Sequence, residues 1–154
     1  MVELYVDADA CPVREEVFRV ATRLELLVHV VSNGSRPIRP PGLPNVTMAL
    51  VAEGADAADD WIAERITAND ICLTNDIPLA ARCLAKSAGA LAFNGKVWSQ
   101  ANIGNALAGR ELSRHLRELG MDKGGGPSFS KTDRSKFLSA LDTLAMAKIR
   151  AAGA

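Results

Sequence analysis

Short apolar runs alternate with amphipathic segments along the first two thirds of the chain. Strand-length apolar runs lie at residues 2–6, 26–31, 46–51, 71–74 and 90–93. Between several of these runs, apolar residues recur three and four positions apart, as at Val13, Val17 and Val20, which predicts helices. Because strands that alternate with helices form parallel crossovers, we predict an α/β fold. Its parallel sheet should have about four to five strands and carry helices on both faces.

Two regions depart from this alternation. Residues 32–45 contain four of the seven prolines and show no helical period, so we expect a loop or lid there and leave open how its two strands are joined. Residues 100–119 and 132–150 have the apolar spacing of helices, with a glycine-rich loop at residues 124–127 between them. We therefore expect residues 1–154 to form one domain, in which residues 100–154 are a mainly helical part.

Composition excludes several classes of protein. Apolar residues make up 48% of the 154 positions and charged residues 23%, which is typical of a chain with one core and excludes disorder and a disulfide scaffold. The three cysteines, Cys11, Cys72 and Cys83, have no metal-ligand spacing, so we expect buried, reduced thiols. No apolar run approaches the length of a membrane span, and the N-terminus lacks a signal pattern. We expect a cytoplasmic protein with no membrane partner.

The formal charge of zero conceals a strong polarity. Residues 1–80 carry 13 acids and 6 bases (6 − 13 = −7), whereas residues 81–154 carry 5 acids and 12 bases (12 − 5 = +7). Such a polarity is consistent with an anionic partner. It is equally consistent with two halves that neutralise each other across the fold or across a dimer contact, so the sequence leaves oligomerisation undecided.

Acidic residues follow two of the predicted strands. Asp7 and Asp9 come directly after the first strand, and Asp76 comes after the strand that ends at Thr74. In open parallel sheets, ligands bind outside the carboxyl ends of the strands, near the point where the strand order reverses. We therefore expect these acids to converge on one point at that edge of the sheet.

The helix predicted over residues 56–66 brings a further acid inward. Asp59 shares helical spacing with Ile62 and Ile66, so its carboxylate lies on the apolar stripe. A carboxylate in that position must be protonated, paired with an arginine or bound to a cation. Asp56, one turn earlier, is either the helix N-cap or a further charge at the same site.

The acids have no histidine or cysteine cluster beside them. His29 and His115 both lie apart from the acids in sequence. Because a site built only from carboxylate oxygen favours a hard cation over zinc, we predict Mg²⁺ or Mn²⁺ as the cofactor.

Four segments carry a family resemblance. Residues 6–13 (VDADACPV), 54–62 (GADAADDWI), 74–80 (TNDIPLA) and 125–130 (GGPSFS), followed by Asp133 and Arg134, resemble the uncharacterised bacterial YaiI/YqxD family over nearly the whole chain. That family is itself similar to PIN-like nuclease domains. The resemblance implies a Rossmann-like three-layer fold around a parallel sheet.

The PIN-like resemblance also implies an activity. Asp7 matches the acid after the first strand, Asp59 the acid of an Asp-x-x-Ile-Ala helix, and Asp76 the acid of a Thr-x-Asp turn. The implied reaction is divalent-metal-dependent hydrolysis of phosphodiesters, with RNA favoured over DNA, and these three aspartates are the implied catalytic ligands. The other implied members of the site are Asp9 and Asp56 near the metal, and Thr74 and Asn75, which would orient a water or an Asp76 oxygen. Asp9 is an addition to the PIN pattern, and the acid that usually lies on the helix between the first two motifs has no clear counterpart.

Basic residues in the second half could follow a phosphate backbone. Arg110, Arg114 and Arg117 form a stripe at helical spacing. Lys123, Gly125, Gly126 and Arg134 lie in or near the glycine-rich loop, whose amides could hold a phosphate. A solvated helix face beside a hinge is the alternative. Trp61 and Trp98 are expected to pack, the latter in a polar turn.

Two other functions fit the same residues. Asp7-Ala8-Asp9 resembles the nucleophile pair of haloacid-dehalogenase-type phosphatases, with Asp7 as the nucleophile, although no lysine stands in a convincing position to pair with a phosphoaspartate. A non-catalytic protein that binds metal or nucleic acid would retain the same acids.

Overall fold

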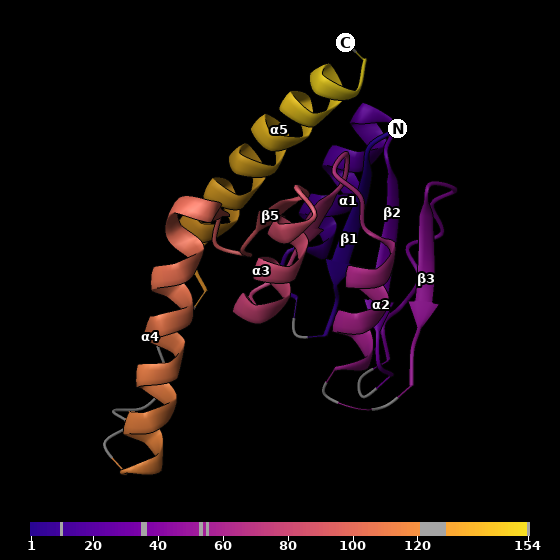
Figure 1. The fold of residues 1–154 in the computed structure, drawn as a ribbon. Coiled ribbons are helices and arrows are strands. Elements are labelled where there is room, and N and C mark those ends of the chain that lie inside the picture. Colours follow the sequence, from indigo (N-terminus) through magenta and orange to yellow (C-terminus); the bar gives the residue numbers. More distant parts are fainter. Residues whose placement is uncertain (10, 35–36, 53, 55, 121–128, 154) are drawn as a thin grey trace.

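The computed structural model of the chain describes residues 1–9, 11–34, 37–52, 54, 56–120 and 129–153. Helices and strands alternate as the apolar pattern predicts, and the C-terminal part is helical (Figure 1). The elements in chain order are β1 (Glu3–Asp7), α1 (Arg14–Leu24), β2 (Leu27–Ser32), β3 (Val46–Leu50), α2 (Ala57–Arg65), β4 (Ile71–Leu73), α3 (Ile77–Ala85), β5 (Gly89–Leu91), β6 (Val97–Trp98), α4 (Gln100–Glu118) and α5 (Lys131–Gly153).

The strand order is β3-β2-β1-β4-β5-β6. β1 lies at the centre and pairs in parallel with β2 on one side and with β4 on the other. The chain therefore winds outward from β1 in one direction and then reverses, which places the topological switch between the carboxyl ends of β1 and β4. Asp7 is the last residue of β1, and Asp76 follows β4 directly before α3.

The sheet has one more strand than predicted, and that strand runs antiparallel. β6 pairs with β5 in a single 6-stranded sheet, so Trp98 lies buried in a strand and the expected polar turn at that residue was wrong. A tight turn makes the pairing: Ala92 N donates to Lys96 O at 2.9 Å, and Gly95 takes a positive φ of 94°. A two-residue strand is too short to leave a period in the sequence.

Apolar side chains divide into layers on the two faces of the sheet. Leu4 and Val6 of β1 face the side covered by α1 and α5, whereas Tyr5 faces α2. α3 continues the α2 layer, and α4 packs on α3. The architecture is thus the expected three layers, and it is consistent with a PIN-like fold (Figure 1).

The connection from β2 to β3 contains no helix within its described residues 33–34 and 37–45. Asn45 anchors its end, because its side-chain nitrogen donates to Leu26 O at 2.9 Å and its carbonyl accepts from Val28 N at 2.9 Å. β2 and β3 then pair in parallel over five positions, Val28 to Ser32 with Val46 to Leu50. This extended, proline-rich segment supplies the crossover that the sequence left open.

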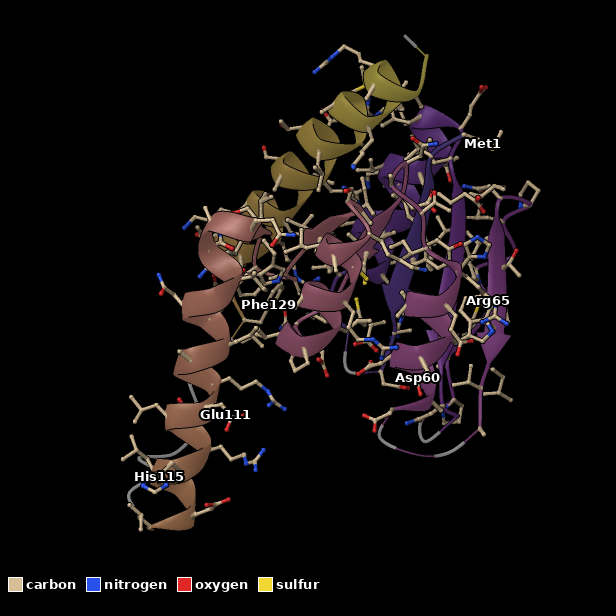
Figure 2. All side chains as sticks on the ribbon, in the orientation of Figure 1. Met1, Asp60, Arg65, Glu111, His115 and Phe129 are labelled. Atoms are coloured by element: carbon tan, nitrogen blue, oxygen red, sulfur yellow. The ribbon has the colours of Figure 1, made fainter. Side chains whose placement is uncertain are left out.

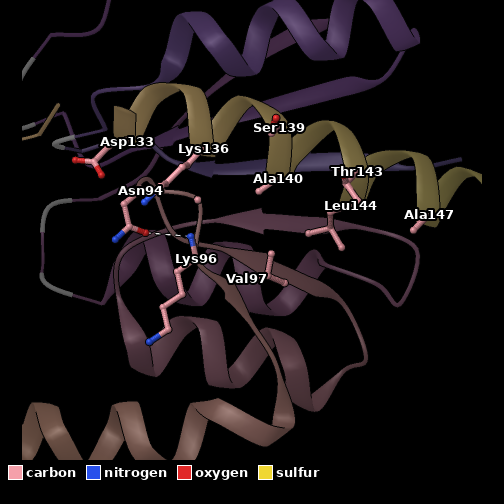
Figure 3. A pocket seen from close by; sticks show the side chains of 11 residues that line it. Asn94, Lys96, Val97, Asp133, Lys136, Ser139, Ala140, Thr143, Leu144 and Ala147 are labelled. Atoms are coloured by element: carbon pink, nitrogen blue, oxygen red, sulfur yellow. Dashed lines mark hydrogen bonds between the residues drawn. The ribbon is translucent and has the colours of Figure 1, made fainter. Parts of the chain in front are cut away.

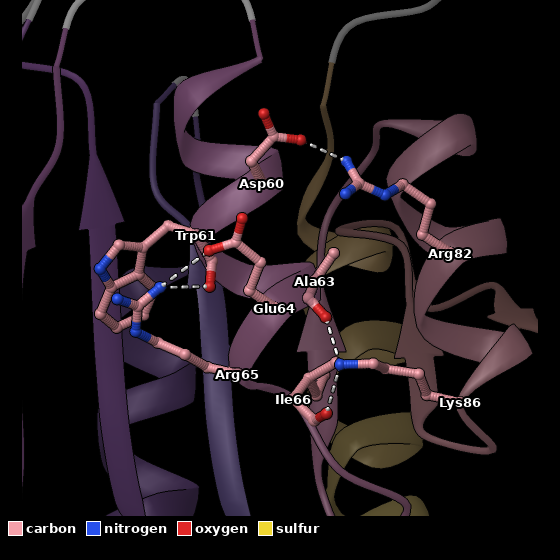
Figure 4. A network of polar contacts seen from close by, with 8 residues as sticks. All are labelled: Asp60, Trp61, Ala63, Glu64, Arg65, Ile66, Arg82 and Lys86. Atoms are coloured by element: carbon pink, nitrogen blue, oxygen red, sulfur yellow. Dashed lines mark hydrogen bonds and ion pairs between the residues drawn. The ribbon is translucent and has the colours of Figure 1, made fainter.

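Polar contacts fasten α2 to α3 (Figure 4). Arg82 donates to Asp60 Oδ1 at 2.8 Å, and Lys86 Nζ donates to the carbonyls of Ala63 and Ile66 at the end of α2. Ile62 is fully buried on the inward face of α2. Asp59, three residues earlier, lies on the same face of the helix and so toward the sheet.

None of the described helices combines the length and the apolar character needed to cross a bilayer.

Candidate active site at the carboxyl edge of the sheet

A buried threonine links the ends of β1 and β4. Thr74 Oγ1 donates to Asp7 Oδ2 at 2.8 Å and accepts from Asp76 N at 2.9 Å. Thr74 has no exposed surface, so its hydroxyl has no water to bind and these two partners satisfy it. The linkage holds Asp7 and the start of α3 in a fixed relation across the topological switch.

Asp76 is the N-cap of α3. Its Oδ1 accepts from Leu79 N at 2.9 Å, and Pro78 follows inside the first turn, where its missing N–H costs nothing. Asn75 points elsewhere, because its Oδ1 accepts from Phe93 N at 2.8 Å and so ties the turn to the end of β5. The described contacts of Thr74 thus hold the Asp7 carboxylate and the backbone of Asp76, and Asn75 holds the turn to the segment after β5. The role expected for both residues, to orient a water or an Asp76 oxygen, stays a prediction.

Asp59 enters the same edge from α2. Its carboxyl group is half-buried, and the pKa of Asp59 is raised from 3.8 to about 7, first by burial. The negative charges of Asp76, Asp7 and Asp56 follow in that order, and a hydrogen bond between the carboxyl groups of Asp59 and Asp76 adds to them. The structure therefore brings Asp59 close enough to Asp76 and Asp7 for their negative charges to disfavour the ionised form of Asp59.

Asp7 is the most enclosed member of the cluster. Burial is the largest cause of a raised pKa for Asp7, and the charges of Asp76 and Asp9 raise it further, while the Thr74 hydrogen bond opposes them. Removal from water thus dominates for this carboxyl group. A buried carboxylate with acidic neighbours is best stabilised by a cation.

Asp9 and Asp56 occupy the margins of the cluster. Asp9 accepts from Ser32 Oγ and from Asn33 N, each at 3.0 Å, so both of its carboxylate oxygens have partners. Asp56 stands at the N-cap position of α2, but its side chain makes no capping hydrogen bond. The N-cap position predicted for Asp56 is confirmed without the hydrogen bond that usually accompanies it, and the charge of Asp56 raises the pKa of Asp59.

The arginine pairing considered for Asp59 has no counterpart in the described part of the chain. The ion pair in this region joins Arg82 to Asp60, and both side chains are about half exposed. Asp60 thus takes the available guanidinium on the outer face of α2 (Figure 4). Asp59 is left to be protonated or to bind a cation.

The chemistry of these donors fits a hard divalent cation, since all of them are carboxylate oxygens. The described residues nevertheless contain no group of three His, Cys, Asp or Glu side chains already arranged around one point where an ion could sit. A cation bound at this edge would favour the deprotonated form of Asp59, whose pKa is raised to about 7.

We expect Asp59→Asn to stabilise the metal-free protein above neutral pH. With a folded pKa of about 7 against an ordinary 3.8, Asp59 loses its proton on unfolding between these values, so its contribution to stability falls as pH rises through that window. The difference corresponds to roughly 4 kcal/mol, and solvent screening of this half-exposed group reduces it to on the order of 1 kcal/mol. Urea unfolding in EDTA at pH 8 and at pH 4 measures the effect.

The gain from Asp59→Asn should shrink toward pH 4, where wild-type Asp59 is protonated in the folded state. Asp60→Asn is the matched control, because Asp60 is exposed on the same helix and its ion pair contributes little. Equal stability of Asp59→Asn and wild type at both pH values would contradict the charge repulsion described here.

The basic stripe of α4 stands apart from the acids. Figure 2 shows Glu111 and His115 on the half of α4 that extends past α3. Arg110 and Arg114 belong to the same segment, are exposed, and pair with acids of their own helix: Arg110 with Glu111, and Arg114 with Glu111 and Glu118. The structure brings neither arginine to the acidic cluster. The side chain of Arg117, and residues Lys123, Gly125 and Gly126, lie outside the described part of the chain.

Arg134 has partners in a different place. Its Nη1 donates to Pro12 O at 2.6 Å and to Glu16 Oε1 at 3.3 Å, and its guanidinium lies over the ring of Phe129. These contacts attach the first turn of α5 to the first turns of α1. They account for Arg134 as a structural residue without any substrate.

A cavity of about 730 Å³ lies between the β5–β6 turn and α5 (Figure 3). Its floor is largely apolar, with Val97, Ala140 and Leu144. Its one acid, Asp133, accepts from Ser130 N at 3.0 Å as part of a helix cap. The cavity also contains Lys96 and Lys136 but no second acid. The candidate site is therefore the edge of the sheet where Asp7 and Asp76 lie on either side of the topological switch.

Sequence reasoning missed the residues that fix the acids. Ser32 and Asn33 hold Asp9, and they had been assigned only to a loop. The available signal was their place at the carboxyl end of β2, next to β1.

Comparisons with known proteins agree over the length of the chain. Residues 5–147 match the family model described as "Uncharacterized BCR, YaiI/YqxD family". A UPF0178 protein of Parvibaculum lavamentivorans is 56% identical over 142 residues, 92% of each chain. One of Paramagnetospirillum magneticum is 56% identical over 144 residues, 94% of each chain. No solved structure gives a significant match. The chain belongs to the YaiI/YqxD family.

Proposed function

We propose that the protein is a divalent-metal-dependent phosphodiesterase that acts on nucleic acid, with RNA favoured over DNA. The observation that carries the proposal is the position of Asp7 and Asp76 on either side of the topological switch, with Asp59 close enough for their charges to raise its pKa. No ion pair within the described residues neutralises any of these three. Ligand sites of open α/β sheets occupy this position.

Each acid would contribute differently to holding Mg²⁺ or Mn²⁺. Thr74 fixes Asp7 through Oδ2, and Leu79 N fixes Asp76 through Oδ1, so each keeps its second oxygen for another ligand. Asp59, on α2, would be the third ligand. A divalent cation held there would neutralise phosphate charge and activate water for attack on phosphorus. Asp9, whose two oxygens accept from Ser32 and Asn33, would add negative charge next to Asp7.

Metal removal tests the proposal directly. The purified chain, stripped with EDTA, should leave a single-stranded RNA oligonucleotide intact, and adding Mn²⁺ should restore cleavage. Gel analysis of RNA and of DNA with the same sequence measures both the activity and the preference. Asp60→Asn should cleave like wild type, because Asp60 is exposed and bound to Arg82.

Other outcomes would assign the protein to the alternatives. Turnover of a small phosphomonoester with a trapped aspartyl-phosphate on Asp7 would indicate a phosphatase. Tight Mn²⁺ or RNA binding with no cleavage would indicate a non-catalytic binding protein. Either result would overturn the phosphodiesterase.

A further inference from the structure

A second surface adjoins the acids and carries the opposite charge. The first turns of α1 and the proline-rich segment enclose a cavity of about 420 Å³. Its cationic residues are Arg14 and Arg39, and its apolar residues include Phe18, Pro40 and Pro41. We call it the Arg14–Arg39 cavity. Its volume lies within the range of about 300–1,000 Å³ that is typical of small-ligand sites.

Both walls of the Arg14–Arg39 cavity are linked to residues that contact or flank Asp9. On one wall, Arg14 Nη1 lies 3.4 Å from Ala8 O and 3.5 Å from Cys11 O, and these carbonyls flank Asp9 in the loop after β1. On the other wall, Pro40 also lines a smaller cavity with Ser32, whose hydroxyl donates to Asp9. The cavity therefore lies beside the acidic edge.

The charge of the Arg14–Arg39 cavity is available to a ligand. Arg39 is exposed, and among the described residues neither Arg39 nor Arg14 takes part in an ion pair. Glu15 is the acid in the lining, so two cations face one anion. The cavity therefore favours an anionic ligand, in contrast to α4, where Glu111 and Glu118 neutralise Arg114.

The remaining lining suits one particular anion. Pro40 and Pro41 offer apolar surface in the same cavity, and the buried Phe18 lines it as well. A nucleotide combines a phosphate, which arginine binds, with a flat base, which packs on apolar and guanidinium surfaces. A free phosphate would leave the apolar part uncovered.

We propose that the Arg14–Arg39 cavity binds the nucleotide that flanks the hydrolysed phosphodiester in a single-stranded nucleic acid. This inference rests on the proposed function, because it places the substrate strand relative to the acidic cluster. Arg39 binds the flanking phosphate, and Arg14 joins that contact to the loop that carries Asp9.

Arg39 is the residue to change, since no described contact of the fold depends on it. With a labelled single-stranded RNA in EDTA, Arg39→Ala should weaken binding by roughly 5- to 10-fold and lower the slope of log K against log salt by about 1. Arg39→Glu should weaken it further, and Arg39→Lys should retain most of the affinity. Fluorescence anisotropy at several salt concentrations measures all of these.

Arg19→Ala is the matched control. Arg19 is an exposed arginine on α1 that lines other cavities, so binding should stay within roughly 2-fold of wild type. Equal binding by Arg39→Ala and Arg19→Ala, in a protein that cleaves RNA, would overturn the cavity and leave the phosphodiesterase standing. RNA binding that depends on Arg39, in a protein that cleaves no RNA, would overturn the phosphodiesterase and leave the cavity as a nucleotide-binding site. A wild type that does not bind RNA would overturn both.

Discussion

Replacing Asp76 with asparagine should weaken Mn²⁺ binding by roughly 100-fold or more and abolish metal-dependent cleavage. The substitution removes one charge from the cluster and one oxygen from the proposed ligand set. It retains the amide oxygen that accepts from Leu79 N, and asparagine caps helices about as well as aspartate. Calorimetric titration with Mn²⁺ measures the affinity, and circular dichroism measures the fold.

The same titration on Asp60→Asn separates the site from general surface charge. Asp60 lies next to Asp59 in sequence but points outward to Arg82, so its loss should leave the Mn²⁺ affinity within roughly 2-fold. Unchanged Mn²⁺ affinity in Asp76→Asn would remove the metal from the proposal.

Phe137→Ala should destabilise the protein by about 3–5 kcal/mol. Phe137 is fully buried in the cluster that joins α5 to α1 and to the sheet, with Leu141 and Ala145 on the same face. Deleting the ring removes its transfer free energy and leaves a cavity that the surrounding helices fill only in part. The expected loss is a large fraction of the stability of a domain this size, and urea unfolding measures it.

Ser139→Ala is the control on the same helix, because Ser139 is exposed and its loss should change stability by less than about 0.5 kcal/mol. A loss below about 1 kcal/mol for Phe137→Ala would contradict the packing of α5 on this core.

The sequence predicts those parts of the fold that depend on repetition. Five runs of apolar residues become β1 to β5. The interior strands β4 and β5 are buried along their whole length, as strands covered on both faces are, whereas β3 is an edge strand and only partly buried. β6 escaped prediction because its pairing depends on the positive φ of Gly95 and on a hydrogen bond across the turn. Those are properties of one turn and leave no period.

The candidate site also has parts that the sequence predicts and parts that it does not. Asp7 and Asp76 could be placed from sequence, because topology alone brings the carboxyl ends of neighbouring parallel strands together. The inward direction of Asp59 followed from helical spacing. The link through Thr74 and the partners of Asp9 could not be foreseen, since each depends on a rotamer and on which loop lies across the edge. The absence of a capping hydrogen bond at Asp56 is a detail of the same kind.

Asp9 differs from its acidic neighbours because both of its oxygens are already committed to the loop after β2. Neutral donors leave its full negative charge in place, so in the proposed site Asp9 attracts a cation from a distance without having to release either partner. In the proposed site Asp9 would add a fixed negative charge, while Asp7, Asp59 and Asp76 would be the direct ligands. The hydrogen bonds of Asp9 also join the loop after β1 to the loop after β2. The acidic edge and the Arg14 side of the neighbouring cavity would therefore move together.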